Sequence, residues 1–219
     1  NALSAGFLIA ILCPIIGSFL VLKRFSMMGD TLSHSAFAGV ALGYFFGMNP
    51  SLASLLYTLA AALLIEYLRN RFKSYEEVVM SIVMTFNVGL AIILASRGRS
   101  ANINSFLFGS ILTVEVTDLI LIAAVTFITL VFVRHFYGQL LYITFDEEGA
   151  EISRIPVKTL NYLFMALTGA AVGVSIRITG LLVISSILVL PMAAALNLRK
   201  GFRHTLYFAV LFGLITVMT

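Results

Sequence analysis

Apolar runs of about 20 residues recur along the whole chain and are separated by short polar segments. About 20 apolar residues is the length at which an α-helix crosses the ~30 Å hydrocarbon core of a bilayer. Hydrophobic residues fill 60% of the 219 positions and charged residues only 11%, whereas a soluble domain is about half apolar and about a quarter charged. A chain of 23.9 kDa has too little interior to bury so much apolar surface in water. The pattern therefore excludes a soluble enzyme, a disordered linker and a disulfide-stapled domain, and it predicts a membrane protein.

Seven runs are long enough to span a bilayer, namely residues 3–22, 31–48, 51–68, 77–95, 118–133, 159–176 and 180–198. An eighth run begins at Leu206. We expect an all-α, polytopic membrane helical bundle of seven to eight spans, forming a single transmembrane domain over residues 1–219. Glycines inside the runs predict close approach of the helices, at Gly39, Gly43, Gly89, Gly169 and Gly173. Since the chain begins without Met and stops inside an apolar run, we also expect a fragment that lacks residues mainly at the C-terminus.

The basic residues fall mostly on one side of the predicted membrane. When successive spans alternate in direction, eleven of the fourteen Lys and Arg residues share one side, and only Arg97, Arg99 and Arg177 fall on the other. Lys and Arg are retained on the cytoplasmic side, so this pattern predicts a multi-pass membrane protein whose more basic side faces the cytoplasm and whose N-terminus starts outside. The net charge of +4 is explained in this way. Because the sequence contains no aromatic-rich basic patch, we expect no nucleic-acid partner.

Most of the acidic residues lie at the predicted membrane boundaries. Glu66 is one helical turn from Arg69, and Glu76 and Glu77 begin the next span. We expect these three carboxylates to pair with basic residues or to reach the interface. Glu115 and Asp118 precede or begin a span, and we expect them to cap its helix.

Two segments do not fit simple helical hairpins. Residues 96–117 contain an apolar stretch from Phe106 to Val114 that is too short to span, and we expect it to be a partly buried or re-entrant piece. Residues 135–158 form the longest predicted cytoplasmic loop. Within it, residues 146–152 predict a short amphipathic helix whose first-turn acids favour the helix dipole.

Asp30 and His34 are the only residues of the Asp, Glu, Lys, Arg and His types between Phe25 and Met48. If this run is helical, His34 lies about 14 Å from its inner end, near the middle of the membrane. Positions i and i+4 share a helix face, so the carboxylate and the imidazole point the same way. Both groups ligate zinc, and an ionisable residue inside a span is a functional candidate. The alternatives are an Asp30 N-cap, a hydrogen-bonded core histidine and a proton-relay pair.

Two ligands do not complete a zinc shell, which usually has four. A two-fold homodimer with this helix face on its axis would supply two Asp and two His, and two-fold symmetry is the commonest in oligomers. We therefore expect Asp30 and His34 to bind a metal together with the same residues of a second copy of the chain.

Four sequence blocks follow one another along the chain: GSFLVLKRFSMMGDTLSHSAFAGVALG at 17–43, NSFLFGSILTV at 104–114, DEEGAEISRIPV at 146–157 and GLLVISSILVLPMAAA at 180–195. In this order the blocks resemble the metal-ion ABC permeases, the zinc and manganese uptake family of ZnuB- and AdcB-like proteins. The resemblance implies a type II ABC importer-like permease of the bacterial plasma or inner membrane that moves a divalent cation into the cytoplasm. It implies a homodimer, two copies of a cytoplasmic ATP-binding subunit and an extracytoplasmic metal-binding protein as partners.

The resemblance also implies roles for particular residues. The block around Asp30 and His34 matches the one associated with cation coordination in relatives. A cytoplasmic coupling segment at about 144–157 would contact the ATPase through Asp146, Glu147, Glu148, Gly149, Glu151 and Ile152. The residues after His34 are closer to the zinc branch than to the manganese branch, so Zn²⁺ is favoured over Mn²⁺, with manganese or iron as alternatives. We expect the metal to be cargo and no cofactor to be bound permanently.

The chain contains no phosphate-binding loop of the G-x-x-x-x-G-K-[ST] type, so we expect a transport subunit that is not itself an enzyme. An ATP-independent cation transporter or channel and a non-transporting membrane scaffold are the competing classes. Phe106 and Phe108 are candidates for an outer gate. Aromatic side chains are also common at the membrane interface, which is the alternative for both.

Overall fold

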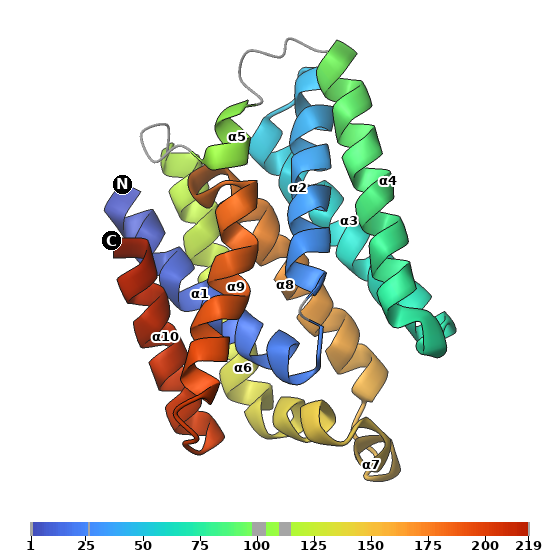
Figure 1. Cartoon of the computed structure of the whole chain (residues 1–219), viewed down its shortest axis with the longest axis vertical. Coiled ribbons are helices and arrows are strands. Elements are labelled where there is room, and N and C mark those ends of the chain that lie inside the picture. The colour runs from blue at the N-terminus through green and yellow to red at the C-terminus, as the bar shows by residue number, and fades with distance from the viewer. Residues whose placement is uncertain (1, 26, 98–103, 110–114, 219) are drawn as a thin grey trace.

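Eight long helices that alternate in direction make up most of the molecule (Figure 1). The computed structural model describes residues 2–25, 27–97, 104–109 and 115–218. The long helices are α1 (Ala2–Leu22), α2 (Met27–Phe46), α3 (Pro50–Arg71), α4 (Glu76–Arg97), α6 (Val116–Phe145), α8 (Val157–Thr179), α9 (Leu181–Leu196) and α10 (Phe202–Met218). Three short elements connect them: η1 (Lys73–Tyr75), α5 (Asn104–Phe108) and α7 (Glu147–Ile152). No strand occurs in these ranges, so the predicted all-α membrane bundle is confirmed.

All eight predicted apolar runs correspond to long helices. By length and hydropathy, α1, α3, α4, α6 and α8 are each able to cross a membrane, and α9 and α10 are shorter apolar helices. The α2 helix carries Asp30, His34 and several hydroxyl side chains, and most of its residues are buried. A helix with this many polar groups avoids lipid when protein surrounds it.

The connections alternate between the two ends of the bundle. The α1–α2, α3–α4, α6–α8 and α9–α10 connections share one end, which is the lower end in Figure 1 and is called the basic end below. Apart from Arg134, which lies within α6, the basic residues predicted to share one side of the membrane belong to these connections or to the helix turns beside them. The α2–α3 and α8–α9 connections and α5 lie at the opposite end, called the α5 end.

Two sequence-based boundaries were wrong. The α6 helix does not end near residue 133 but continues for 30 residues to Phe145, so much of the predicted 135–158 loop is helical. Arg134 and His135 mark the end of the apolar run, but α6 continues past them and past Gly138, with no proline to end it. At 1.5 Å per residue α6 is about 45 Å long and extends beyond the hydrocarbon core. Arg177 lies beyond the predicted 159–176 run, yet α8 includes it and ends before Gly180, whose φ of +76° suits glycine.

Small residues allow α3 to pack closely against α2 and α8. A Cβ atom added at Gly39 would lie 2.8 Å from the Cα of Ser54, and one at Gly173 would lie 2.9 Å from the Cα of Leu55. Gly43 and Gly169 are equally crowded, as predicted. Gly89 does not fit the prediction, because nothing lies within 4 Å of the space that its Cβ would fill.

This contrast predicts different outcomes for two glycine substitutions. Gly39→Leu forces α2 away from α3 and lowers the free energy of unfolding by about 1–3 kcal/mol, the usual cost of overpacking. Gly89→Leu leaves it nearly unchanged. Size-exclusion chromatography of detergent-solubilised protein after heating measures both, and equal loss of the monodisperse peak in the two variants would contradict the packing described.

Candidate functional site

Asp30 and His34 lie on the face of α2 that protein covers least. Asp30 is exposed and His34 is half-buried, whereas Leu32, Ser33 and Ser35 between and beside them are buried. The two side chains are one helical turn apart on the same face, and the carboxylate is close enough to act electrostatically on the imidazole. Within the described ranges, no hydrogen bond or ion pair from the protein reaches either side chain.

The residue at which α2 begins excludes the interpretation of Asp30 as an N-cap. The helix begins at Met27, so Asp30 belongs to its first turn and is not the N-cap of a helix that begins at Thr31. The carboxylate therefore has no capping role that would explain its place in the sequence. Its negative charge does favour the positive end of the helix dipole.

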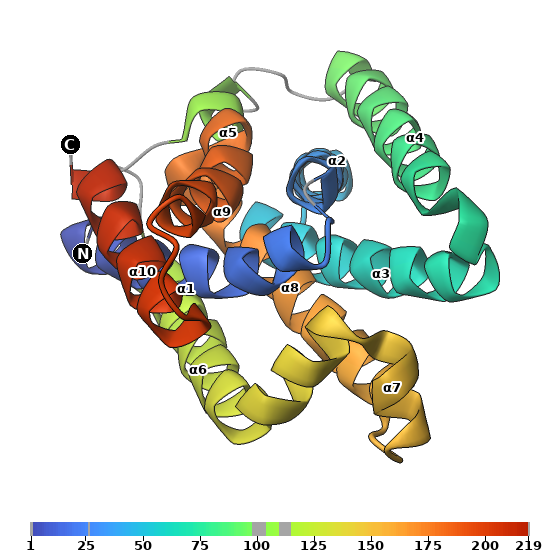
Figure 2. The same ribbon diagram turned by 60° about the horizontal axis from the view of Figure 1, so that its bottom comes forward.

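The α2 helix lies in the middle of the bundle. It contacts α3 and α8 on one side and is flanked by α4 and α9, as Figure 2 shows in a nearly end-on view. Against α9 the approach is close, because a Cβ at Gly29 would lie 3.6 Å from the Cα of Ser185. Helices therefore surround most of α2 and leave the face with Asp30 and His34 open.

One chain supplies an incomplete set of metal ligands at this face. Among the residues that the structure describes, no group of three or more His, Cys, Asp or Glu side chains is placed to hold a metal ion. The Asp30–His34 pair offers one carboxylate and one imidazole. Both are ordinary ligands for zinc, which usually takes four.

A buried polar network fixes α2 against α4 and α3. The Asn87 side chain of α4 is only 1% exposed; its Nδ2 donates to the Ser35 Oγ over 2.8 Å and its Oδ1 accepts from the Tyr57 hydroxyl over 2.7 Å. On the next residue of α2, the Ser54 hydroxyl of α3 donates to the Ala36 carbonyl over 3.1 Å. These bonds lie beside His34 in sequence and fix the rotation of α2. The sequence analysis missed Asn87 because it searched the spans only for ionisable residues.

The predicted coupling segment contains the short helix α7, at the basic end. Asp146 caps α7 by accepting from the Gly149 amide over 2.9 Å. Glu148, Glu151 and Ile152 are exposed, and the apolar side chain of Ile152 is 84% accessible. A single exposed apolar side chain is common on protein surfaces, so Ile152 does not by itself mark a contact surface.

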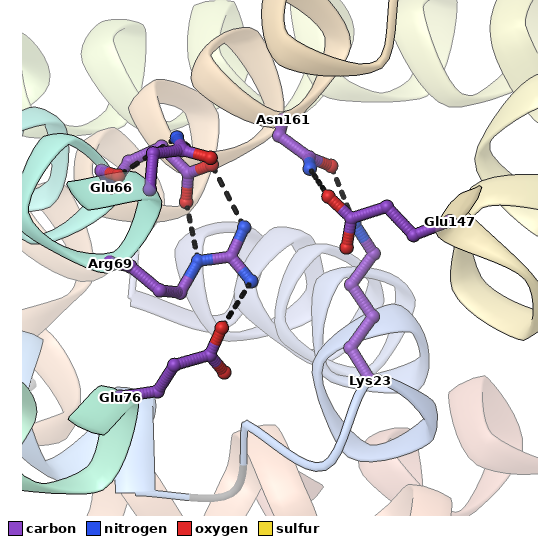
Figure 3. A network of polar contacts seen from close by, with 7 residues as sticks. Lys23, Glu66, Arg69, Glu76, Glu147 and Asn161 are labelled. Atoms are coloured by element: carbon purple, nitrogen blue, oxygen red, sulfur yellow. Dashed lines mark hydrogen bonds and ion pairs between the residues drawn. The ribbon is translucent and has the colours of Figure 1, made fainter. Parts of the chain in front are cut away.

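Glu147 faces inward, unlike Glu148 and Glu151. Its carboxylate accepts from the Asn161 side chain over 3.1 Å, and the Asn161 Oδ1 accepts from Lys23 over 2.6 Å (Figure 3). Burial lowers the pKa of the Lys23 ammonium to about 8, and the positive charge of Arg69 acts in the same direction. These two bonds connect α7 through α8 to the α1–α2 connection.

Arg69 forms the second half of this network at the basic end. It donates to both carboxylate oxygens of Glu66, over 3.0 and 2.9 Å, and lies 3.7 Å from the Glu76 carboxylate (Figure 3). The guanidinium also stacks on Phe25, 4.4 Å from the ring centre, just before α2 begins. The expected pairing of Glu66 and Glu76 with basic residues is confirmed. Arg69 and Glu66 are both buried, so the pair ties α3 to the start of α4 and α2.

The α5 end holds a cluster of charged side chains around Arg177. Glu115 and Asp118 form a reciprocal capping box at the start of α6, which confirms the expected caps. The Arg177 guanidinium also donates to Asp118 over 2.8 Å and to Glu115 over 3.0 Å. Because the predicted 159–176 run ends before Arg177, hydropathy did not predict these ion pairs.

The two candidate gate residues have different environments. Phe106 is buried and packs edge-to-face on Tyr44 of α2, with ring centres 6.0 Å apart. Phe108 is 73% exposed. The Gly109 and Gly180 backbones lie against each other, so α5 is held on the α8–α9 connection. The re-entrant stretch expected from Phe106 to Val114 is helical at its start, and residues 110–114 lie outside the described ranges, as does Arg99.

Comparison with known families matches residues 1–219 to the ABC 3 transport family. A protein of Treponema pallidum named "Probable metal transport system membrane protein" is 43% identical over 98% of this chain and 81% of its own length. The manganese transport system membrane protein MntC of Halalkalibacterium halodurans is 30% identical over 100% of this chain and 75% of its length. The high-affinity zinc uptake system membrane protein ZnuB of Haemophilus influenzae is 28% identical over 99% of this chain and 84% of its own length.

A solved structure has the same arrangement of helices. The complex of PsaBC from Streptococcus pneumoniae with a Fab contains a chain that is 28% identical, with a TM-score of 0.84. The match covers 98% of this chain and 78% of that one. The predicted resemblance to metal-ion ABC permeases is therefore confirmed, as is a multi-pass location in a bacterial cell membrane.

The polar network behind α2 predicts the effect of removing the Asn87 amide. Asn87→Leu leaves the half-buried Tyr57 hydroxyl and the buried Ser35 Oγ without this partner and lowers the free energy of unfolding by about 1–3 kcal/mol. Thr85→Val on the same helix is the matched control, since the Thr85 hydroxyl is exposed and bonds only to its own helix. Thermal unfolding followed by circular dichroism measures both. A melting curve of Asn87→Leu that coincides with that of the control would show that the network does not hold α2.

Proposed function

The chain belongs to the ABC 3 transport family, and on that premise we propose that Asp30 and His34 of α2 form its cargo site for a divalent metal cation. The permease carries the cation through the membrane into the cytoplasm. The observation that supports this most directly is that α2 buries nearly all its polar side chains except these two. An ionisable pair in a helix at membrane depth, with no protein partner in the described ranges, is suited to bind an ion that passes.

The site is completed by a second copy of the chain. One chain offers one carboxylate and one imidazole. A two-fold axis beside the open face of α2 adds the same two groups from the second copy, which gives the four ligands that zinc usually takes. Two different side chains from each copy make a compact shell without any further ligand. Cargo must also leave the site, and side chains contributed by two separable surfaces allow release when the surfaces move apart.

Energy is supplied by a separate ATP-binding subunit, one for each copy of the permease. The basic end faces the cytoplasm, as the excess of Lys and Arg there indicates. The exposed residues Glu148, Glu151 and Ile152 of α7 contact the ATPase, and Asp146 and Gly149 shape the cap of that helix. Glu147 transmits the contact inward, because it bonds to Asn161 and through it to Lys23. An ATP-independent transporter does not need such a surface.

The opposite end receives the cation from an extracytoplasmic metal-binding protein. Phe106 is the better of the two gate candidates, because it is buried against Tyr44 at the outer end of the same helix that carries Asp30 and His34. Phe108 is exposed and suits an interfacial role.

Zn²⁺ is the favoured cargo because the block that follows His34 is closer to the zinc branch of the family. Mn²⁺ is the second candidate, favoured by the 30% identity to a manganese transport protein over the whole chain. A carboxylate and an imidazole accept either ion, and the intrinsic affinity of such a site is higher for zinc than for manganese.

Two substitutions test the cargo site. Asp30→Asn and His34→Ala each remove one ligand type from both copies and reduce uptake at least tenfold. Uptake of ⁶⁵Zn and ⁵⁴Mn into cells that depend on this transporter measures the effect, and a zinc permease accumulates ⁶⁵Zn faster. Glu77→Gln and His204→Ala alter an exposed carboxylate and an exposed imidazole elsewhere and leave uptake at the wild-type level. Wild-type uptake by both Asp30→Asn and His34→Ala would refute the site.

A second experiment tests the role of α7. Glu148→Lys reverses an exposed charge, so it lowers metal-stimulated ATP hydrolysis of the reconstituted transporter several-fold and leaves thermal stability unchanged. Glu147→Gln instead weakens the bond to Asn161 and lowers thermal stability as well as ATP hydrolysis. Unchanged ATP hydrolysis in Glu148→Lys would contradict docking of the ATPase on this surface.

A further inference from the structure

A pocket of about 560 Å³ lies between α1, α6 and α10, away from Asp30, His34 and α7. Its polar lining consists of two arginines and two tyrosines, and its remaining walls are aliphatic: the lining includes Arg134, Arg203, Tyr137, Tyr207, Ile15 and Leu130. The pocket therefore combines two positive charges with an apolar surface. None of the roles proposed above uses it.

The two arginines have no acidic partner. Neither arginine takes part in an ion pair within the described ranges. The Arg203 guanidinium lies over the Tyr137 ring, 5.8 Å from the ring centre, in a cation–π contact. The sequence explains this, since no Asp or Glu occurs from residue 119 to 145 or after residue 151. Two unneutralised guanidinium groups that line one pocket favour an anionic ligand.

The depth of the pocket indicates where the ligand comes from. Arg134 is 18 residues beyond the start of α6 at Val116, which is about 27 Å along the helix axis and close to the ~30 Å thickness of the hydrocarbon core. Arg203 is the second residue of α10, at the basic end of that helix. Ile15 and Leu130 lie deeper along α1 and α6. The charged part of the pocket is therefore at headgroup level and the apolar part at acyl-chain level.

We infer that this pocket binds an anionic phospholipid of the leaflet at the basic end. The Arg134 and Arg203 guanidiniums bind the phosphate and the headgroup charge, and planar guanidinium groups suit phosphate oxygens. The Tyr137 and Tyr207 hydroxyls are positioned at the interface to hydrogen-bond the headgroup. The aliphatic walls cover the first part of an acyl chain, which a free phosphate ion lacks.

Native mass spectrometry of the purified chain with added lipid tests this inference. Dioleoyl phosphatidylglycerol binds wild-type protein, and zwitterionic dioleoyl phosphatidylcholine binds at least tenfold more weakly. Each interfacial charge is worth about fivefold in lipid affinity, so the double variant Arg134→Gln/Arg203→Gln binds phosphatidylglycerol roughly 30-fold more weakly. Arg71→Gln removes an exposed charge at the same end of the bundle but outside the pocket, and it retains wild-type binding.

A second double variant keeps the test independent of folding. Arg134→Lys/Arg203→Lys preserves both charges and binds phosphatidylglycerol within a few-fold of the wild type. Equal affinity of the wild type for the two lipids would overturn the inference, as would wild-type binding by the glutamine variant. Displacement of the lipid by inorganic phosphate at equal concentration would also overturn it, because the site would then recognise a free anion.

Discussion

A carboxylate and an imidazole at membrane depth cannot face lipid, because leaving an ionisable group in hydrocarbon costs at least a few kcal/mol. This constraint accounts for the position of α2 in the middle of the bundle, with α3 and α8 behind it and α4 and α9 on its flanks. The bonds from Asn87 and Ser54 hold its rotation, so that Asp30 and His34 point away from the protein core. The same arrangement leaves one open face of a central helix, which a second copy of the chain is suited to cover.

The basic end connects this helix to the surface that would receive the ATPase. Glu147, Asn161 and Lys23 form a continuous set of hydrogen bonds from α7 to the α1–α2 connection. Arg69 adds a stacking contact on Phe25, only five residues before Asp30. These contacts link α7 and α3 to the chain just before the helix that carries Asp30 and His34. The buried Glu66–Arg69 pair lies within α3, and Arg69 also approaches Glu76 at the start of α4, so α3 and α4 meet at the same place.

Hydropathy alone predicted the eight long helices, because a bilayer imposes one length on nearly every apolar run. It placed the end of α6 wrongly, since the membrane surface at Arg134 is the end of the apolar run and not of the helix. Asp30 and His34 could be found from their charge and spacing. Asn87 could not be found in this way, because the role of an uncharged polar residue in a span depends on its partners on other helices. The inward direction of Glu147 and the ion pairs of Arg177 likewise depend on contacts between distant parts of the chain.

The central claim is that one cation binds between two copies of α2. X-ray absorption at the zinc edge, combined with the metal content of the assembled transporter, tests it most directly. The account predicts one zinc for every two permease chains, bound by nitrogen and oxygen ligands at about 2.0–2.2 Å with two imidazoles in the shell. One zinc per chain, or a shell with a single imidazole, would contradict it.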